Sequence, residues 1–169
     1  MIARMGRRPG NFTGFAICVA LVAYALYVQY GLHLEPCPLC IFQRIAVIAL
    51  GTVFLIAALH NPARIGARIY AGLIVLAAAA GGGVAARHLW IQSLPPDKVP
   101  ACGAPFAQLW DMLPLRGLIA TVLRGDGECA KIDWTFLGLA MPAWVLIALV
   151  ALATWGLIVN LKPTEARSK

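Results

Sequence analysis

The sequence predicts an all-α membrane protein, a four-transmembrane-helix bundle with a short amphipathic helix in one long loop. The 169 residues are 61% hydrophobic and only 12% charged, which is about half the charge of a typical soluble domain. Four long apolar runs follow one another, and most of the charged residues fall between or beyond them. We therefore expect a single membrane domain over residues 1–169, embedded in a lipid bilayer.

The net charge of +7 is unevenly distributed along the chain. Basic residues gather in the two tails and one short middle loop: Arg4, Arg7, Arg8, Arg64, Arg68, Lys162, Arg167 and Lys169. Six of the seven acidic residues lie in the other two loops. Basic residues gathered on one side of a membrane explain this excess, so we expect no nucleic-acid partner.

The first apolar run, about 12–32, is long enough to cross a hydrocarbon core of about 30 Å. Its basic start and the small residues Ala23-Tyr24-Ala25 resemble a signal peptide and its cleavage site. The apolar run continues well past that site and leads into a cysteine-containing loop, about 33–39. We therefore expect an uncleaved membrane span.

The second span, about 40–59, must include an arginine. The charge-free stretch Ile45 to Leu59 gives only about 22 Å of helix, so a full span begins near Cys40 and takes Arg44 into the membrane boundary. An arginine at that depth is costly unless it reaches the interface or has a partner. Arg44 is therefore a candidate functional residue, and the alternative is a simple interfacial anchor.

The third and fourth spans cover about 69–87 and 135–161. Gly81-Gly82-Gly83 in the third span permits close packing of neighbouring helices. The fourth span is long enough to cross the bilayer with tilt, and Pro142 near its start predicts a kink.

The long loop, about 88–134, contains the predicted amphipathic helix. Pro95-Pro96 and Pro100 exclude a continuous helix at its start. Apolar residues then recur at helical spacing, which indicates a helix lying on the membrane: Leu115, Leu118, Ile119, Val122 and Leu123. Gly125-Asp126-Gly127 predicts a turn just before Cys129. The positive-inside rule makes both termini cytoplasmic and places the two cysteine-containing loops on the same outer side.

Four of the five cysteines fall in these two outward loops: Cys37, Cys40, Cys102 and Cys129. Cys18 lies among apolar residues in the first span, where we expect it only to pack. The outer compartment of a bacterium is oxidising, so two thiol pairs there predict two disulfides. They are either inert bridges that staple the loops or a redox relay. We expect no metal, because Cys102 and Cys129 lie too far apart in sequence to form a second zinc knuckle.

The pair Cys37-Pro38-Leu39-Cys40 favours the relay. Two thiols at this spacing close a disulfide that exchanges easily. Cys40 falls near the start of the second span, where the positive end of that helix and Arg44 would stabilise its thiolate. We therefore expect Cys40 to be the deeper, electron-donating sulfur and Cys37 the one exposed for exchange.

A relay needs an electron acceptor. The sequence has neither a dinucleotide-binding glycine motif nor a haem attachment motif, so a lipid-soluble quinone is the expected acceptor. Arg44 could donate a hydrogen bond to a quinone oxygen. His88 could line the same pocket or donate a proton, and the alternative for it is an interfacial residue without a ligand.

These residues resemble the disulfide bond formation protein B (DsbB) family of bacterial inner-membrane thiol oxidases. The similarity rests on Pro36-Cys37-Pro38-Leu39-Cys40 with Arg44, on Cys102 and Cys129, and on the segment from Trp134 to Trp144. It covers nearly the whole chain.

The resemblance implies a four-helix enzyme of the bacterial inner membrane that reoxidises the periplasmic thioredoxin-fold oxidant DsbA and reduces ubiquinone or menaquinone. It implies that the partner attacks a Cys102–Cys129 disulfide, with Cys102 carrying the mixed disulfide. Electrons then reach Cys37–Cys40, and the Cys40 thiolate forms a charge-transfer contact with the quinone beside Arg44. We assign no role to Gln43. The alternative is a non-enzymatic membrane assembly protein with two loop-stapling disulfides.

Overall fold

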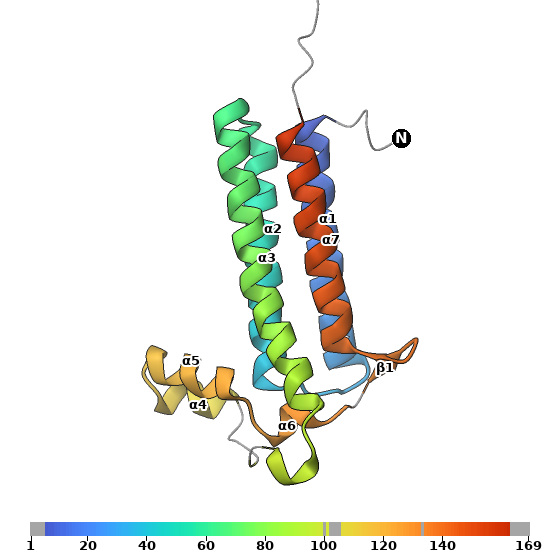
Figure 1. Ribbon diagram of the computed structural model, residues 1–169, viewed down its shortest axis with the longest axis vertical. Helices are drawn as coiled ribbons and strands as arrows, with labels where there is room; N and C mark the ends of the chain where they lie inside the picture. The colour runs from blue at the N-terminus through green and yellow to red at the C-terminus, as the bar shows by residue number, and fades with distance from the viewer. Residues whose placement is uncertain (1–5, 100, 102–105, 133, 163–169) are drawn as a thin grey trace, which may run out of the picture.

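A computed structural model of the chain describes residues 6–99, 101, 106–132 and 134–162. Four long helices form the bundle: α1 (Arg7–Gly31), α2 (Pro38–His60), α3 (Arg64–Gln92) and α7 (Met141–Leu161). All four are long and apolar enough to cross a membrane, which confirms the predicted fold class. Figure 1 shows the start of α1, the end of α7 and the α2–α3 turn at one end of the bundle, and the remaining connections at the other.

Small residues let these helices approach one another closely. α3 packs mainly against α7, and α1 against α2. A Cβ added to Gly81 would lie 2.8 Å from the Ala46 Cβ, and one added to Gly14 would lie 2.7 Å from the Phe54 ring. Cys18 is buried in the same core. The predicted packing role of Cys18 is therefore confirmed, and the close packing predicted for Gly81-Gly82-Gly83 is confirmed at Gly81, whereas a Cβ added to Gly83 would meet nothing within 4 Å.

The predicted start of the fourth span is wrong. α7 begins at Met141, and residues 135–140 form a hairpin of β1 (Thr135–Phe136) and β2 (Leu139–Ala140). Leu137 and Gly138, between the strands, both have positive φ, as a tight two-residue hairpin turn requires. Pro142 lies in the first turn of α7, where its fixed φ suits helix initiation, so it starts the helix instead of kinking it.

α3 extends further than predicted. We placed His88 at the start of the long loop, but the helix continues to Gln92, because no helix-breaking residue occurs before Pro95. His88 is therefore fixed on a regular helix and has an exposed fraction of only 2%. This burial places the His88 ring inside the protein, away from the outer surface of the bundle.

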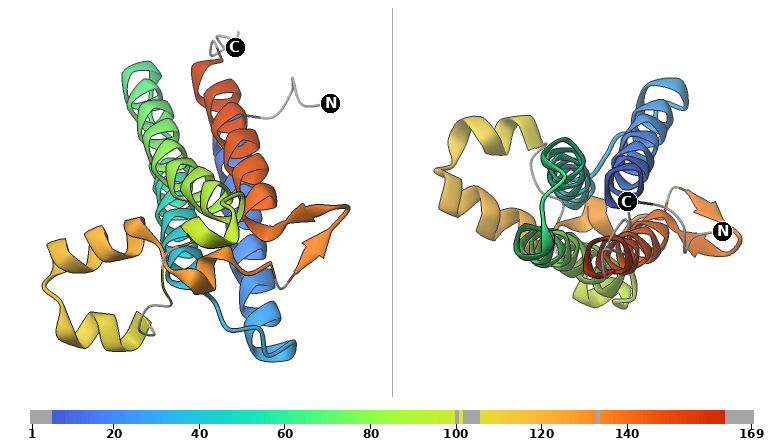
Figure 2. Two further views of the ribbon diagram at one scale, coloured as in Figure 1. Left: turned by 60° about the horizontal axis from the view of Figure 1, so that its bottom comes forward. Right: turned by 90° about the horizontal axis from the view of Figure 1, so that it is seen from above.

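The described parts of the long connection between α3 and α7 contain four short helices. These are the 3₁₀ helix η2 (Pro96–Lys98), α4 (Phe106–Met112), α5 (Leu115–Arg124) and α6 (Gly127–Ala130). The amphipathic helix is confirmed as α5, because Leu118 and Val122 are buried while its other face is exposed. Figure 2 shows α4 and α5 projecting from one side of the bundle and the β1–β2 hairpin from the other.

Apolar packing and one arginine hold this connection against the bundle. A second buried cluster joins α2, α3, α5 and α6: Leu39, Ile91, Leu118, Val122 and Cys129. Arg87 of α3 donates hydrogen bonds to the carbonyl oxygens of Leu123 (3.1 Å) and Arg124 (3.0 Å) at the end of α5. Its guanidinium also lies 4.1 Å from the centre of the Trp90 ring. These contacts bring α6, and Cys129 with it, to the start of α2.

Candidate functional site

The Cys37–Cys40 pair forms the first turn of α2. Cys37 is the N-cap and Pro38 occupies the first helical position, where a missing N–H does no harm. The backbone N–H of Cys40 donates to the Cys37 Sγ at 3.3 Å, and the two sulfur atoms lie 3.0 Å apart. Closing a disulfide of about 2.05 Å therefore needs only a small movement. The sequence led us to expect the positive end of α2 to stabilise the Cys40 sulfur. In the structure a backbone N–H at that end also donates to the Cys37 sulfur.

Cys129 is held in place by its own short helix. The Asp126 Oδ1 accepts a hydrogen bond from the Cys129 N–H at 3.1 Å and caps α6. The preceding turn uses Gly125 at φ +77°, close against Ile91 of α3. Cys129 itself has an exposed fraction of 0%. The predicted turn at residues 125–127 is confirmed, and it directs Cys129 into the bundle.

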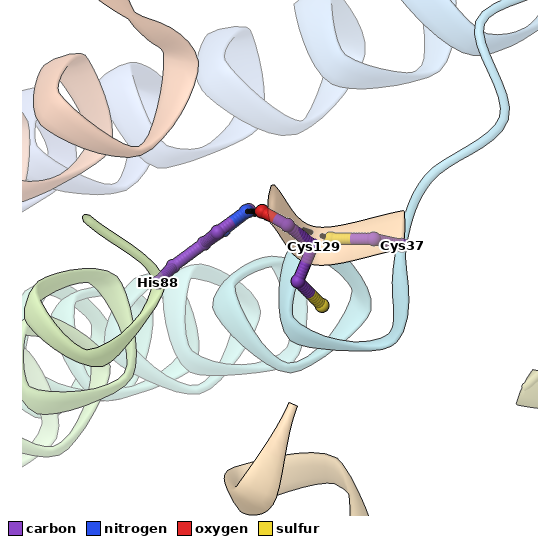
Figure 3. Close-up of side chains that lie close together, drawn as sticks. All are labelled: Cys37, His88 and Cys129. Carbon is purple, nitrogen blue, oxygen red and sulfur yellow. Dashed lines mark hydrogen bonds between the residues drawn. The ribbon is translucent and has the colours of Figure 1, made fainter. Parts of the chain in front are cut away.

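His88 links α2, α3 and α6. Figure 3 shows its ring reaching the backbone carbonyl of Cys129, with Cys37 directed toward the same point. The His88 Nε2 lies 3.0 Å from that carbonyl oxygen, and the Nδ1 lies 3.0 Å from the Gln43 Nε2. Because a carbonyl only accepts hydrogen bonds, Nε2 carries the hydrogen, and Nδ1 accepts from the Gln43 amide. The two contacts thus specify one tautomer of a neutral imidazole.

Three thiols of the described residues lie around this histidine. The Cys37 Sγ lies 3.8 Å from the His88 Nε2, and the Cys40 Sγ lies 4.0 Å from the Nδ1. The Cys37 sulfur, a His88 ring nitrogen and the Cys129 sulfur all lie within 4.8 Å of one another. Cys37 can therefore exchange with Cys40 on one side and with Cys129 on the other.

The same atoms are of the kind that bind zinc. Two cysteine sulfurs and one imidazole at this separation are common ligands of that metal. Here, however, the His88 nitrogen nearest Cys37 already donates to the Cys129 carbonyl. A metal at this position would have to displace that hydrogen bond, so the arrangement suits thiol exchange better.

The Cys37 and Cys129 thiols both hold their protons more tightly than an ordinary thiol, because the pKa of each is raised. For Cys37, contact with Cys129 lowers the pKa, but contact with Cys40 together with burial raises it more, so the net pKa is raised. For Cys129, contact with Cys37 and burial both raise the pKa. In the reduced site, little of either thiol is ionised at neutral pH.

Arg44 lies one turn after Cys40 on α2 but is directed toward α1. Its Nη1 donates to the Gln29 side-chain oxygen, and its Nη2 donates to the Ala25 carbonyl oxygen at 3.1 Å. The partner that an intramembrane arginine requires is therefore supplied by α1. The structure thus brings Cys37, Cys40, His88 and Cys129 together, and places Arg44 beside this group. Cys102 lies outside the described residues.

Gln43 is a site residue that the sequence analysis missed. Its exposed fraction is 4%, and its amide contacts the His88 ring. The sequence did offer one signal, because Gln43 is a second polar residue directly before Arg44 at the edge of an apolar run. Polar residues in membrane helices usually have partners, so Gln43 could have been predicted to contact another polar side chain.

Comparison with known proteins identifies the family. A family model described as "Disulfide bond formation protein DsbB" matches residues 7–159. The chain belongs to the DsbB family. It is 50% identical over 145 residues to disulfide bond formation protein B of Methylococcus capsulatus, covering 86% of this chain and 88% of that protein. The protein of the same name from Chromobacterium violaceum is 47% identical over 157 residues, with 90% and 95% coverage.

A third relative is the disulfide bond formation protein B of Xanthomonas oryzae pv. oryzae, which is 50% identical over 160 residues, with 94% and 93% coverage. The resemblance noted in the sequence is therefore confirmed. As a DsbB family member with four apolar helices, the chain is a multi-pass membrane protein with an oxidoreductase role in disulfide bond formation.

Proposed function

We propose that this protein is a quinone-dependent thiol oxidase that reoxidises a periplasmic DsbA-type dithiol protein and passes the electrons to ubiquinone or menaquinone. The observation that carries the proposal is the position of Cys37. Its sulfur lies 3.0 Å from the Cys40 sulfur and within 4.8 Å of the Cys129 sulfur. One sulfur between two others can pass a disulfide from one loop to the other.

The exchange steps balance in atoms and electrons. A thiolate of the reduced partner attacks a Cys102–Cys129 disulfide at Cys102 and releases the Cys129 thiol. The partner's second thiol resolves the mixed disulfide, so that the partner leaves oxidised and Cys102 and Cys129 are reduced. Cys129 then attacks Cys37 in the Cys37–Cys40 disulfide and releases Cys40. Cys102 next attacks Cys129, and Cys37 is released as a thiol.

The remaining step regenerates the Cys37–Cys40 disulfide. Two electrons and two protons leave the dithiol, and a quinone takes them up as it becomes a quinol. Cys40 and Arg44 are four residues apart on α2, so they share a face of that helix. A guanidinium has five N–H donors, and the contacts to Gln29 and Ala25 use two groups, so donors remain for a quinone oxygen. Exposed Ile45 and Ile48 nearby suit an isoprenoid tail.

We also propose that the membrane is the bacterial inner membrane, with both termini in the cytoplasm and the thiols facing the periplasm. The basic residues Arg7, Arg64, Arg68 and Lys162 gather at the end of the bundle opposite the thiols, in agreement with the positive-inside rule.

The test mixes purified protein, a reduced DsbA-type partner and ubiquinone, and follows the loss of quinone absorbance. The wild type and a Cys18→Ser control should turn over, because Cys18 is buried far from the site in the first core cluster. Cys40→Ser should not turn over. Quinone that stays oxidised with the wild type, or normal turnover by Cys40→Ser, would refute the proposal.

A variant of Arg44 separates the two half-reactions. Arg44→Ala should slow quinone reduction more than it slows a single oxidation of the partner, because its spare donors act only on the quinone side. Equal losses in both rates would argue against a quinone role. Purely structural disulfides would be recognised by thiol trapping, since they would stay oxidised when quinone is depleted.

A further inference from the structure

The end of the bundle opposite the thiols contains a cavity of about 250 Å³. Its lining comes from the start of α1, the first two turns of α3 and the end of α7: Arg7, Arg64, Arg68, Asn160, Leu161 and Lys162. Three of these side chains, those of Arg7, Arg64 and Arg68, are guanidinium cations. Like charges gathered around one cavity repel one another unless an anion lies between them.

Within the described residues, no carboxylate lies at this end of the bundle. The acidic residues of that part of the chain are all in the loops near the thiols: Glu35, Asp97, Asp111, Asp126 and Glu128. The starts of α1 and α3 add positive potential, because neither helix has an acidic residue in its first turn or a side-chain N-cap. The three guanidinium groups and the two helix starts therefore create a positive potential on the α1 and α3 sides of the cavity, which an anion would neutralise.

Hydrogen bonds hold the walls of the cavity in place. The Arg7 Nη2 donates to the Lys162 carbonyl oxygen at 2.8 Å and ties the start of α1 to the end of α7. Below it, Asn11 and Asn160 are both buried and exchange two side-chain hydrogen bonds of 3.0 and 2.9 Å. Arg64 and Arg68 lie one turn apart on α3, so their side chains emerge side by side. The α1–α7 wall of the site is thus fixed before any ligand binds.

The position of the cavity indicates the source of the anion. It lies where three apolar helices end, which is the depth of lipid headgroups. Ile65 and Ile69, next to the two arginines on α3, have exposed fractions of 77% and 58%. A ligand with both a phosphate and acyl chains would satisfy the arginines and cover these side chains, whereas free phosphate would satisfy only the arginines.

We propose that this cavity binds the phosphate of an anionic phospholipid. Arg64 and Arg68 hold the phosphate oxygens, since a guanidinium binds phosphate through paired hydrogen bonds, and Arg7 closes the site from α1. The acyl chains lie along Ile65 and Ile69. Basic pockets between membrane helices are a recognised way of binding anionic headgroups. The site is independent of the proposed thiol chemistry at the other end.

The test is native mass spectrometry of the full-length protein in detergent, with phosphatidylglycerol and phosphatidylcholine added in equal amounts. The wild type should retain phosphatidylglycerol about tenfold more than phosphatidylcholine, and thermal unfolding should shift to higher temperature only with phosphatidylglycerol. The double variant Arg64→Ala/Arg68→Ala should lose both effects. A double variant Arg64→Lys/Arg68→Lys should keep part of them, because lysine keeps the charge without the planar fork.

The matched control is Arg116→Ala/Arg124→Ala, which removes two exposed arginines from α5 at the opposite end and should behave like the wild type. Equal retention of both lipids by the wild type would overturn the proposal. So would unchanged selectivity in the Arg64/Arg68 double variant, or an equal loss in the control. Inorganic phosphate distinguishes the two sources: if it raises the unfolding temperature as much as phosphatidylglycerol does, the ligand is free phosphate and the lipid assignment is wrong. Unfolding in phosphatidylcholine alone checks that each variant is folded.

Discussion

At the scale of single residues, His88 connects the two cysteine-containing segments. One ring nitrogen donates to the backbone of Cys129, and the other accepts from Gln43 on the helix that carries Cys37 and Cys40. The ring is buried, so each partner it satisfies would otherwise lose a hydrogen bond without gaining water. His88 therefore positions Cys129 against Cys37, apart from any contact with a quinone.

Replacing His88 with phenylalanine should slow disulfide transfer between the loops. The change keeps an aromatic ring but removes two hydrogen bonds from buried groups. Each unsatisfied group is worth about 1–3 kcal/mol, so we expect transfer from Cys129 to Cys37 to slow about 10- to 100-fold. Quenched-flow thiol trapping measures that step. His60→Phe, an exposed histidine that contacts Tyr70, is the control. An unchanged transfer rate in His88→Phe would show that the histidine does not position Cys129.

The raised pKa of Cys129 predicts the pH dependence of its alkylation. A higher pKa leaves less thiolate at any given pH, and only the thiolate reacts. In fully reduced protein, the rate of iodoacetamide addition to Cys129 should be low at pH 8. It should still be rising above pH 9, where a thiol with the ordinary pKa of 9.0 is half ionised. Mass spectrometry of the Cys129 peptide gives the rate. A plateau at or below pH 9 would contradict the assigned environment.

At the scale of elements, the turn before α6 determines where Cys129 lies. Gly125 has φ +77°, a conformation that side-chain-bearing residues rarely adopt, and an added Cβ would clash with the Ile91 Cδ1. Gly125→Ala should therefore displace α6 from α3 and slow Cys129–Cys37 exchange about tenfold or more, as measured by thiol trapping.

Gly138 provides a matched control for that substitution. It has nearly the same φ, +79°, but a Cβ there would meet nothing within 4 Å. Gly138→Ala places a side chain at a positive φ, which costs about 1–2 kcal/mol, without the clash, and it lies in the β1–β2 hairpin. It should leave the exchange rate unchanged. If both variants slow exchange equally, strain or general instability is responsible and the Ile91 contact is not.

The sequence predicts those elements whose cause is local. Hydropathy located the four long helices, and the spacing of Leu118 and Val122 located α5. Both signals can be recognised within a short stretch of sequence, because a helix repeats every 3–4 residues. Residues 135–140 were misassigned because their apolar character continues into α7, and the hairpin depends on the paired φ of Leu137 and Gly138.

The candidate site was likewise only partly predictable from the sequence. The spacing of Cys37, Cys40 and Arg44 on one helix was readable from the sequence. The contacts of His88 with Gln43 and with the Cys129 carbonyl join positions 45 and 41 residues apart in the chain. Such contacts depend on how α2, α3 and α6 pack, which a single sequence without related sequences does not reveal.

At the scale of the whole molecule, the bundle has two chemically different ends. Thiols, His88 and a buried apolar cluster occupy one end, and cations surround a cavity at the other. The larger apolar core of the bundle, which includes Cys18, Phe54 and Leu149, lies between the two ends. Each end is held by contacts of its own: the apolar cluster with Leu39 and the His88 hydrogen bonds at the thiol end, and the α1–α7 hydrogen bonds at the other. Substitutions at one end should therefore leave the chemistry of the other largely intact.

A buried amide pair joins the first membrane helix to the last. Asn11 of α1 and Asn160 of α7 exchange two hydrogen bonds, and the Asn160 Nδ2 also donates to the Gly156 carbonyl oxygen at 2.9 Å. A double-mutant cycle of Asn11→Ala, Asn160→Ala and the double variant should give a coupling free energy of about 0.6–2 kcal/mol, as hydrogen bonds between membrane helices do. The free energy of unfolding in a denaturing detergent titration measures this coupling.

The matched control pairs Asn11→Ala with Thr52→Ala, and the two effects should be additive. Thr52 is an exposed α2 residue whose hydroxyl donates to the Ile48 carbonyl oxygen of its own helix. Additive effects in the asparagine cycle would mean that this pair does not stabilise the α1–α7 contact, and that apolar packing and the remaining hydrogen bonds, such as Trp155 Nε1 to the Gly10 carbonyl oxygen, hold the two helices together.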